Sequence, residues 1–116
     1  MYPPDVPSVG ATDVASDAVV LDVREDDEWA AGHIDGARHI PMGELPARFA
    51  DVGDLSDKAP TGELVVVCRS GNRSARVVDW LARNGVDAVN LAGGLRAWAA
   101  AGRPMVSETG GEPFVR

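Results

Sequence analysis

Apolar and polar residues follow one another along the chain in a pattern that predicts short strands and helices in turn. Compact apolar runs with β-branched residues are typical of strands buried in a sheet. The two clearest runs are AVVLDVR at 18–24 and GELVVVC at 62–68. Weaker strand patterns occur near 6–9, where we expect an edge strand, within 32–41 and at 87–94.

The segments between these runs have apolar residues at helical spacing or residues that favour helix ends. They predict helices at 25–33, 42–56, 74–84 and 95–102. Strands that alternate with helices indicate an α/β domain with a mostly parallel sheet. Ligands of such sheets bind at the carboxyl ends of the strands. Cys68, the only cysteine of the chain, falls at one of these ends.

Length and composition fit a single globular domain. The chain has 116 residues, of which 45% are hydrophobic and 25% charged. We expect one domain over 1–116, with its core at about 6–104 and a surface tail at 105–116 that is partly mobile. No apolar run approaches the roughly 20 residues that cross a membrane, and the opening MYPPDVPSVG lacks the pattern of a signal peptide. We therefore expect a cytoplasmic protein.

The net charge and the cysteine count exclude several kinds of partner and site. A formal net charge of -7 disfavours nucleic acid and anionic membranes as partners. One cysteine cannot form an internal disulfide, which fits a reducing compartment, and it cannot build a multi-cysteine zinc site. His33 and His39 have no recognisable metal-ligand spacing. We expect neither a metal nor a cofactor.

The segment after Cys68 has to turn the chain from a strand into a helix. Gly71 and Asn72 are the residues best able to adopt a left-handed backbone there, and Ser70 and Ser74 can cap the start of the helix. A tight turn of this kind points successive N–H groups toward one centre. Together with the helix N-terminus it attracts anions.

The same segment is basic, although the protein is acidic. Arg69, Arg73 and Arg76 follow Cys68 closely, and such a cluster by itself is often only a solvated helix face. Beside a thiol, however, the arginines and the helix dipole favour the thiolate, which is the attacking species. We expect Cys68 to bond covalently to a small anionic substrate. The alternative is an inert cysteine that packs as a small hydrophobe.

Three blocks of sequence, in this order and spacing, resemble the single-domain rhodaneses, the thiosulfate sulfurtransferase family. The blocks are LDVREDDEWAAGHIDGARHIP, VVVCRSGNRSARVVDWLARNG and VNLAGGLRAWAAAGRP, and the similarity covers roughly 18–104. The resemblance implies the rhodanese fold, with helices on both faces of a mostly parallel sheet. It also implies that a cysteine takes the outer sulfur of thiosulfate, releases sulfite, and passes the sulfur from a persulfide to cyanide or an external thiol.

The resemblance also assigns roles to residues of the loop 68–73. Cys68 is the nucleophile and the sulfur carrier. The side chains of Arg69 and Arg73 help to hold the thiosulfate dianion. The persulfide cradle is formed by the backbone of Arg69, Ser70, Gly71, Asn72 and Arg73.

Several other residues in the matched blocks are expected to be structural. Asp22 and Arg24 belong to the LDVR block, and we expect hydrogen bonds and an ion pair from them to hold neighbouring loops. His33 is expected to be a hydrogen-bonded structural residue and not a base.

Two further functions remain open. Cysteine phosphatases, some of which share this fold, place an arginine after five intervening residues. Here Arg73 follows Cys68 after four, which disfavours a bidentate phosphate contact. The second alternative is a persulfide carrier or regulatory binding module that exchanges sulfur with protein donors and acceptors, and the presence of Cys68 is compatible with it.

Overall fold

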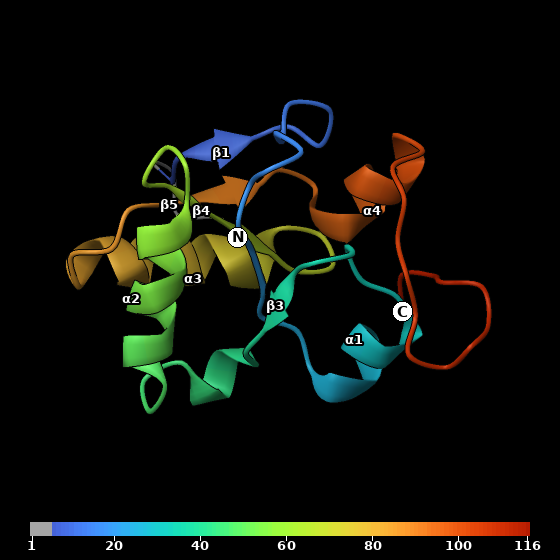
Figure 1. The fold of residues 1–116 in the computed structure, drawn as a ribbon, viewed down its shortest axis with the longest axis horizontal. Helices are drawn as coiled ribbons and strands as arrows, with labels where there is room; N and C mark the ends of the chain where they lie inside the picture. Colours follow the sequence, from blue (N-terminus) through green and yellow to red (C-terminus); the bar gives the residue numbers. More distant parts are fainter. Residues whose placement is uncertain (1–5) are drawn as a thin grey trace.

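The computed structural model describes residues 6–116, and its centre is a five-stranded sheet (Figure 1). The strands stand in the order β1-β5-β4-β2-β3, and every neighbouring pair is parallel. This confirms the predicted α/β fold, and β1 is an edge strand as expected. The first five residues of the predicted domain lie outside the described residues. The strands are β1 (Ser8–Val9), β2 (Val20–Asp22), β3 (Arg38–His39), β4 (Leu64–Val67) and β5 (Ala88–Leu91).

Helices cover both faces of the sheet, which also agrees with the prediction. They are α1 (Asp26–Ala31), α2 (Phe49–Lys58), α3 (Asn72–Arg83) and α4 (Gly94–Ala100), with a 3-10 turn η1 (Met42–Glu44) before α2. Successive residues of a strand point to opposite faces. Val66 accordingly packs in one hydrophobic cluster with α2 and α3, and Val65 packs in another with Trp98 of α4. None of the helices within 6–116 is long and apolar enough to cross a membrane.

The central strand β4 places Cys68 in the middle of the sheet. It pairs with β2 on one side and with β5 on the other, and Val66 lies opposite Leu21 and Asn90. All four residues of β4 are buried, because layers of side chains cover both faces. This explains why the strand is continuously apolar in sequence. Cys68 follows directly at its carboxyl end.

The helix predicted at 42–56 is divided into two pieces. The first is η1, and the α-helical piece α2 begins only at Phe49. Pro46 has no backbone N–H, so it cannot donate the hydrogen bond that would continue a helix from Met42. The chain instead closes a 3-10 bond from the Leu45 N–H to the Met42 carbonyl at 3.3 Å. The prediction of one continuous helix over 42–56 was therefore wrong.

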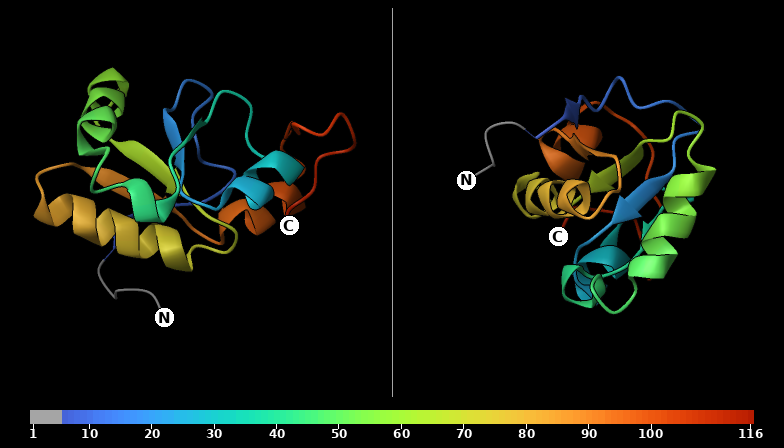
Figure 2. Two further views of the ribbon diagram at one scale, coloured as in Figure 1. Left: turned by 90° about the horizontal axis from the view of Figure 1, so that it is seen from below. Right: turned by 90° about the vertical axis from the view of Figure 1, so that its left-hand side faces the viewer.

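The C-terminal segment 105–116 runs back along α1 (Figure 2). His33 and Val106 exchange two backbone hydrogen bonds of 2.9 and 2.8 Å. The Phe114 N–H donates to the Ala31 carbonyl at 3.1 Å. The predicted surface tail is thus hydrogen-bonded to the end of α1.

Gly32 ends α1, and glycine is required there for its small size. Its φ of 174° is extended backbone, which any residue can adopt. A Cβ atom at this position would lie 2.5 Å from the carbonyl oxygen of Phe114 and 2.7 Å from its nitrogen. Glycine therefore lets the C-terminal segment approach the backbone of this turn closely.

Candidate active site

The turn after β4 begins at Cys68 and ends at Gly71, where α3 starts. Cys68 is buried, with 1% of its surface exposed. Gly71 has a φ of 100°, in the left-handed region that favours glycine. No other type of residue within 6–116 has a positive φ, and Asn72 is the first residue of the helix. Of the two residues predicted to turn the chain, only Gly71 does so, and α3 begins two residues earlier than predicted.

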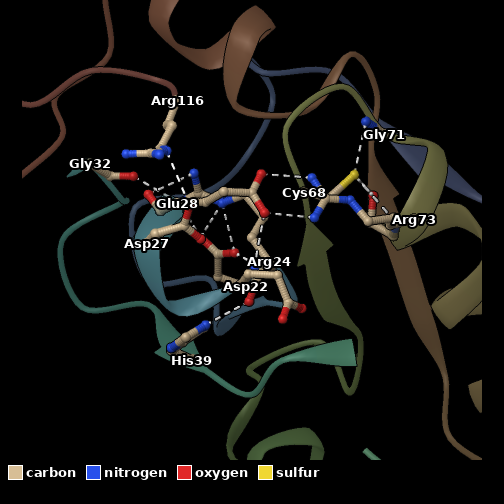
Figure 3. Close-up of polar contacts among 12 residues, drawn as sticks. Asp22, Arg24, Asp27, Glu28, Gly32, His39, Cys68, Gly71, Arg73 and Arg116 are labelled. Carbon is tan, nitrogen blue, oxygen red and sulfur yellow. Dashed lines mark hydrogen bonds and ion pairs between the residues drawn. The ribbon is translucent and has the colours of Figure 1, made fainter. Parts of the chain in front are cut away.

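Hydrogen-bond donors from the turn and the first helical turn converge on the sulfur (Figure 3). The Gly71 N–H lies 3.1 Å from Sγ of Cys68, and the Ser74 N–H lies 3.4 Å from it. The Ser74 hydroxyl is 3.2 Å from the same atom. Ser74 is buried within α3 and does not cap the helix, which corrects one of the two predicted serine caps. It is instead a member of the site.

These donors shift the ionisation of the thiol. Burial by itself raises the pKa of Cys68. Hydrogen bonds from the Ser74 hydroxyl and from the backbone of Ser74, Gly71 and Ser70 outweigh it, so the pKa of Cys68 lies below its ordinary value. The predicted direction is therefore confirmed, but uncharged donors and not the arginines lead its causes.

The backbone of the turn is held by the start of α4. The Leu95 N–H donates to the Cys68 carbonyl at 2.9 Å, and the Arg96 N–H donates to the Arg69 carbonyl at 3.0 Å. Gly94 makes this approach possible, because a Cβ atom there would lie 2.5 Å from the Arg69 oxygen. Its φ of 63° also suits glycine. The glycine pair after β5 thus fixes the position of the turn that carries Cys68.

Arg73 extends to α1 and forms a two-pronged ion pair with Glu28 (Figure 3). Its two terminal nitrogens lie 2.7 and 2.8 Å from the two carboxylate oxygens. The hydrogen bonds between them lower the pKa of Glu28 and raise the pKa of Arg73. The positive charge predicted to serve the substrate is therefore matched by a carboxylate of the protein. Arg69, in contrast, is exposed.

A second, fully buried ion pair holds α1 in place. Arg24 binds Asp22 at 2.7 Å, and both side chains are 0% exposed. Arg24 also donates to the carbonyls of Glu28 and Gly32, at 3.1 and 2.8 Å. The expected structural role of this pair is confirmed. By fixing α1, the pair also fixes the backbone that carries Glu28.

Two histidines also have structural contacts on this side of the molecule. His33 Nδ1 lies 2.7 Å from the Trp29 carbonyl, as expected for a hydrogen-bonded structural residue. The Trp29 ring stacks on His33 with centroids 3.5 Å apart and on His39 with centroids 4.7 Å apart. These contacts join α1 to β3.

The structure adds three residues that the sequence did not identify as part of the site. Glu28 stands in an acidic run that also suits a helix start. The position of Ser74 at the start of the predicted helix predicts only a cap. Asn90 lies in a predicted strand, and a polar residue near the carboxyl end of a buried strand is a usable signal. Asn90 is 0% exposed, and its side chain contacts both Ser74 and Gly71.

Known proteins share both the sequence and the fold. The rhodanese-like domain family matches residues 10–101. The chain is 41% identical to the putative sulfurtransferase YtwF of Bacillus subtilis over 73% of this chain and 77% of that one. It is 40% identical to the thiosulfate sulfurtransferase GlpE of Pseudomonas putida, over 72% and 71% of the two chains. A rhodanese-related protein of Thermoplasma volcanium superposes with a TM-score of 0.75 at 32% identity, over 86% and 97% of the two chains.

Proposed function

The chain belongs to the rhodanese-like domain family, and from this membership we propose that it is a sulfurtransferase in which Cys68 carries the transferred sulfur. The observation that supports the role of Cys68 most is the convergence of the Gly71 N–H, the Ser74 N–H and the Ser74 hydroxyl on Sγ. These donors favour a thiolate, which is the form of cysteine that attacks sulfur.

The first half-reaction is a displacement at the outer sulfur of a donor such as thiosulfate. The Cys68 thiolate attacks that sulfur, and a new S–S bond forms as the S–S bond of thiosulfate breaks. Sulfite leaves with the electron pair of the broken bond. A thiolate of charge -1 and a dianion thus yield a persulfide of charge -1 and a sulfite dianion, so the charges balance and no proton has to move.

The second half-reaction returns the enzyme to its starting form. A thiophilic acceptor, either cyanide or an external thiolate, attacks the outer sulfur and leaves Cys68 as a thiolate. The turn from Cys68 to Arg73 is proposed to cradle the outer sulfur through its backbone. Arg69, Ser70, Gly71, Asn72 and Arg73 supply that backbone.

The side chains around the turn are proposed to differ in how they serve a dianion. Arg69 is exposed and makes no ion pair with any residue within 6–116, so its charge is available at the mouth of the turn. Arg73 already binds Glu28 with both of its terminal nitrogens. We propose that Arg69 attracts the anion and that Arg73 contributes only as much charge as Glu28 leaves uncompensated.

This pairing also supports a second candidate, a persulfide carrier that receives sulfur from a protein donor. A site in which Arg73 is neutralised by Glu28 and Cys68 is 1% exposed has less to offer a free dianion. A protein donor could present its own persulfide at the turn. Rates with thiosulfate, compared with rates from protein persulfide donors, distinguish the two candidates.

A phosphatase is the least favoured candidate. The arginine of a phosphatase would have to bind the phosphate through two N–H groups of its guanidinium. The arginine nearest in sequence to the required position, Arg73, directs both prongs to Glu28. Hydrolysis of an aryl phosphate without any sulfur transfer would reverse this ranking.

Intact mass spectrometry tests the proposed function. After treatment with thiosulfate, we expect the protein to gain the mass of one sulfur atom and to lose it again on addition of cyanide. The Cys68→Ser variant should gain nothing. A sulfur adduct that forms equally on this variant would overturn the proposed role of Cys68, whichever donor is physiological.

A further inference from the structure

A buried side-chain network behind the sulfur links Cys68 to β5. The Ser74 Oγ lies 3.2 Å from Cys68 Sγ and 2.5 Å from Asn90 Oδ1. Ser74 and Asn90 are both 0% exposed. A serine hydroxyl carries one hydrogen, so it donates to only one of these two acceptors at a time. The sulfur and the amide oxygen therefore compete for the same proton.

The orientation of the Asn90 amide is fixed by its other neighbour. The Nδ2 group lies 3.2 Å from the carbonyl oxygen of Gly71, which can only accept a hydrogen bond. Nδ2 therefore faces Gly71, and Oδ1 faces the Ser74 hydroxyl. Two oxygens 2.5 Å apart need a hydrogen between them, and only the serine has one to give. The geometry allows no flipped amide.

We propose that Asn90 is a positioning residue for the Ser74 hydroxyl. It accepts the hydrogen bond of that hydroxyl whenever Cys68 Sγ is uncharged, and Sγ accepts it instead when the thiol ionises. With a thiol, the S–H donates to Ser74 Oγ and the Ser74 O–H donates to Asn90. On ionisation, the thiol proton leaves for solvent and the Ser74 O–H turns to the sulfur. The buried Asn90 oxygen then loses its donor, and leaving a buried acceptor unpaired is costly.

This inference rests on the proposed function and deepens it, because it concerns the same sulfur. The negative charge of a persulfide lies on the outer sulfur, so Sγ is uncharged and the Ser74 hydroxyl is again available to Asn90. Asn90 therefore favours the thiol and the loaded persulfide over the free thiolate, in opposition to the hydrogen-bond donors that face Sγ. Asn90 and Cys68 thus exert opposite pulls on one hydroxyl, and Asn90 limits how far the pKa of Cys68 falls.

If Asn90 merely supported the turn, its removal would change the pKa of Cys68 in the opposite direction. If Asn90 only held the turn, its loss would loosen the amides around the sulfur and raise the pKa of Cys68. The turn has other supports, however. The Gly71 carbonyl also accepts the Ala75 N–H at 3.1 Å, and the Cys68 carbonyl accepts the Leu95 N–H at 2.9 Å. Removal of the Asn90 amide therefore leaves the turn anchored.

The charged groups around the turn are the same in the protein with Asn90 and in a variant that lacks its amide. Arg73 and Glu28 neutralise each other on the α1 side, and the buried pair of Asp22 and Arg24 lies behind them. The arginines at the outer edge of the turn and on α4 are exposed. Substitution of Asn90 alters none of these charges, so any shift in the ionisation of Cys68 comes from the hydroxyl.

The test compares Asn90→Leu with the unaltered protein. Leucine has a similar branched shape without donor or acceptor. The rate of alkylation by iodoacetamide, followed by intact mass across a range of pH, gives the pKa of Cys68 without any sulfur donor. We expect Asn90→Leu to lower that pKa and to speed alkylation below neutral pH by about threefold or more, since each tenfold rise in thiolate fraction is one unit of pKa.

The matched control removes the shared hydroxyl. Ser74→Ala should raise the pKa of Cys68, and Asn90→Leu added to it should leave that pKa unchanged, because nothing remains to compete for. A raised or unaltered pKa in Asn90→Leu alone would overturn the proposal. Circular dichroism checks the fold, and Asn90→Ala replaces Asn90→Leu if the larger side chain disturbs it. A failure here leaves the sulfur adduct on Cys68 intact, so it is distinguishable from a failure of the proposed function.

Discussion

Two regions that meet at Cys68 are built from different interactions. On the side of β5 and α3, the sulfur is surrounded by uncharged donors from Gly71 and Ser74. On the side of α1, the contacts are ion pairs, one between Arg73 and Glu28 and one between Arg24 and Asp22 (Figure 3). The cations of the α1 side are matched by carboxylates. Uncharged donors thus lower the pKa of the Cys68 thiol, while the charged residues mainly hold the surrounding elements.

The division has a physical reason. In the proposed reaction with thiosulfate, a free guanidinium beside the sulfur would attract both the donor dianion and the departing sulfite. Backbone amide donors are fixed by the fold and need no counterion, so they can stabilise a thiolate or the outer sulfur of a persulfide without trapping the product. The ion pairs keep α1 and the turn together at the same time.

The largest expected effect comes from removal of the sulfur itself. Cys68→Ser should abolish sulfur transfer, with a loss on the order of a thousandfold or more, because serine offers no thiolate. The fold should persist, since the change is small and the turn keeps its backbone contacts with α4. A thiosulfate:cyanide assay together with circular dichroism measures both. Full activity in this variant would refute the assignment.

Loss of the buried ion pair on the α1 side should lower the free energy of unfolding more than it changes the pKa of Cys68. Arg24→Met leaves Asp22 as a buried carboxylate without its partner, and we expect the free energy of unfolding to fall by about 3–5 kcal/mol. Urea denaturation measures the change. The matched control is Arg48→Ala, since the Arg48 side chain is 42% exposed in its ion pairs and should contribute less than about 1 kcal/mol. Equal effects in the two variants would contradict the structural role of the buried pair.

Loss of an uncharged donor to the sulfur should change the pKa of Cys68 more than it changes the free energy of unfolding. The Ser74 hydroxyl favours the thiolate, so Ser74→Ala should raise the pKa of Cys68 and move the rising limb of the pH–rate profile to higher pH. At pH values below the pKa of Cys68, the variant should react about tenfold more slowly than the unaltered protein. At high pH, where both thiols are ionised, the two rates should become similar. Ser74→Thr keeps a hydroxyl and is the control. A loss of rate that is independent of pH would indicate damage to the turn instead.

The smallest effect concerns the link between the two regions. Glu28→Gln removes the charge that neutralises Arg73, so KM for thiosulfate should fall by about two- to fivefold, the size of a partly exposed ion-pair contact. Arg73→Ala should raise KM, and it should do so more strongly in the Glu28→Gln background than in the unaltered protein. Steady-state kinetics of the four proteins provide the measurement. An unchanged KM in all of them would leave anion binding to the backbone and Arg69.

The sequence by itself determined the features that depend on neighbouring residues. The apolar run at 62–68 predicted the central strand, and the glycine after it predicted the turn, because burial on both faces and a left-handed backbone restrict residue choice locally. The predicted strand and the predicted turn together placed Cys68 at the carboxyl end of β4. The division of the helix predicted at 42–56 also has a local cause, because Pro46 has no N–H to continue the helix.

Only the tertiary structure decided which distant side chains meet at the sulfur. Glu28 is 45 residues from Arg73, and Asn90 is 16 residues from Ser74. No local rule relates these positions, since their contact depends on how α1 packs and on the register between β4 and β5. Packing therefore turned a predicted cationic site into one in which hydroxyl and amide donors lower the pKa of Cys68 and a carboxylate pairs with Arg73.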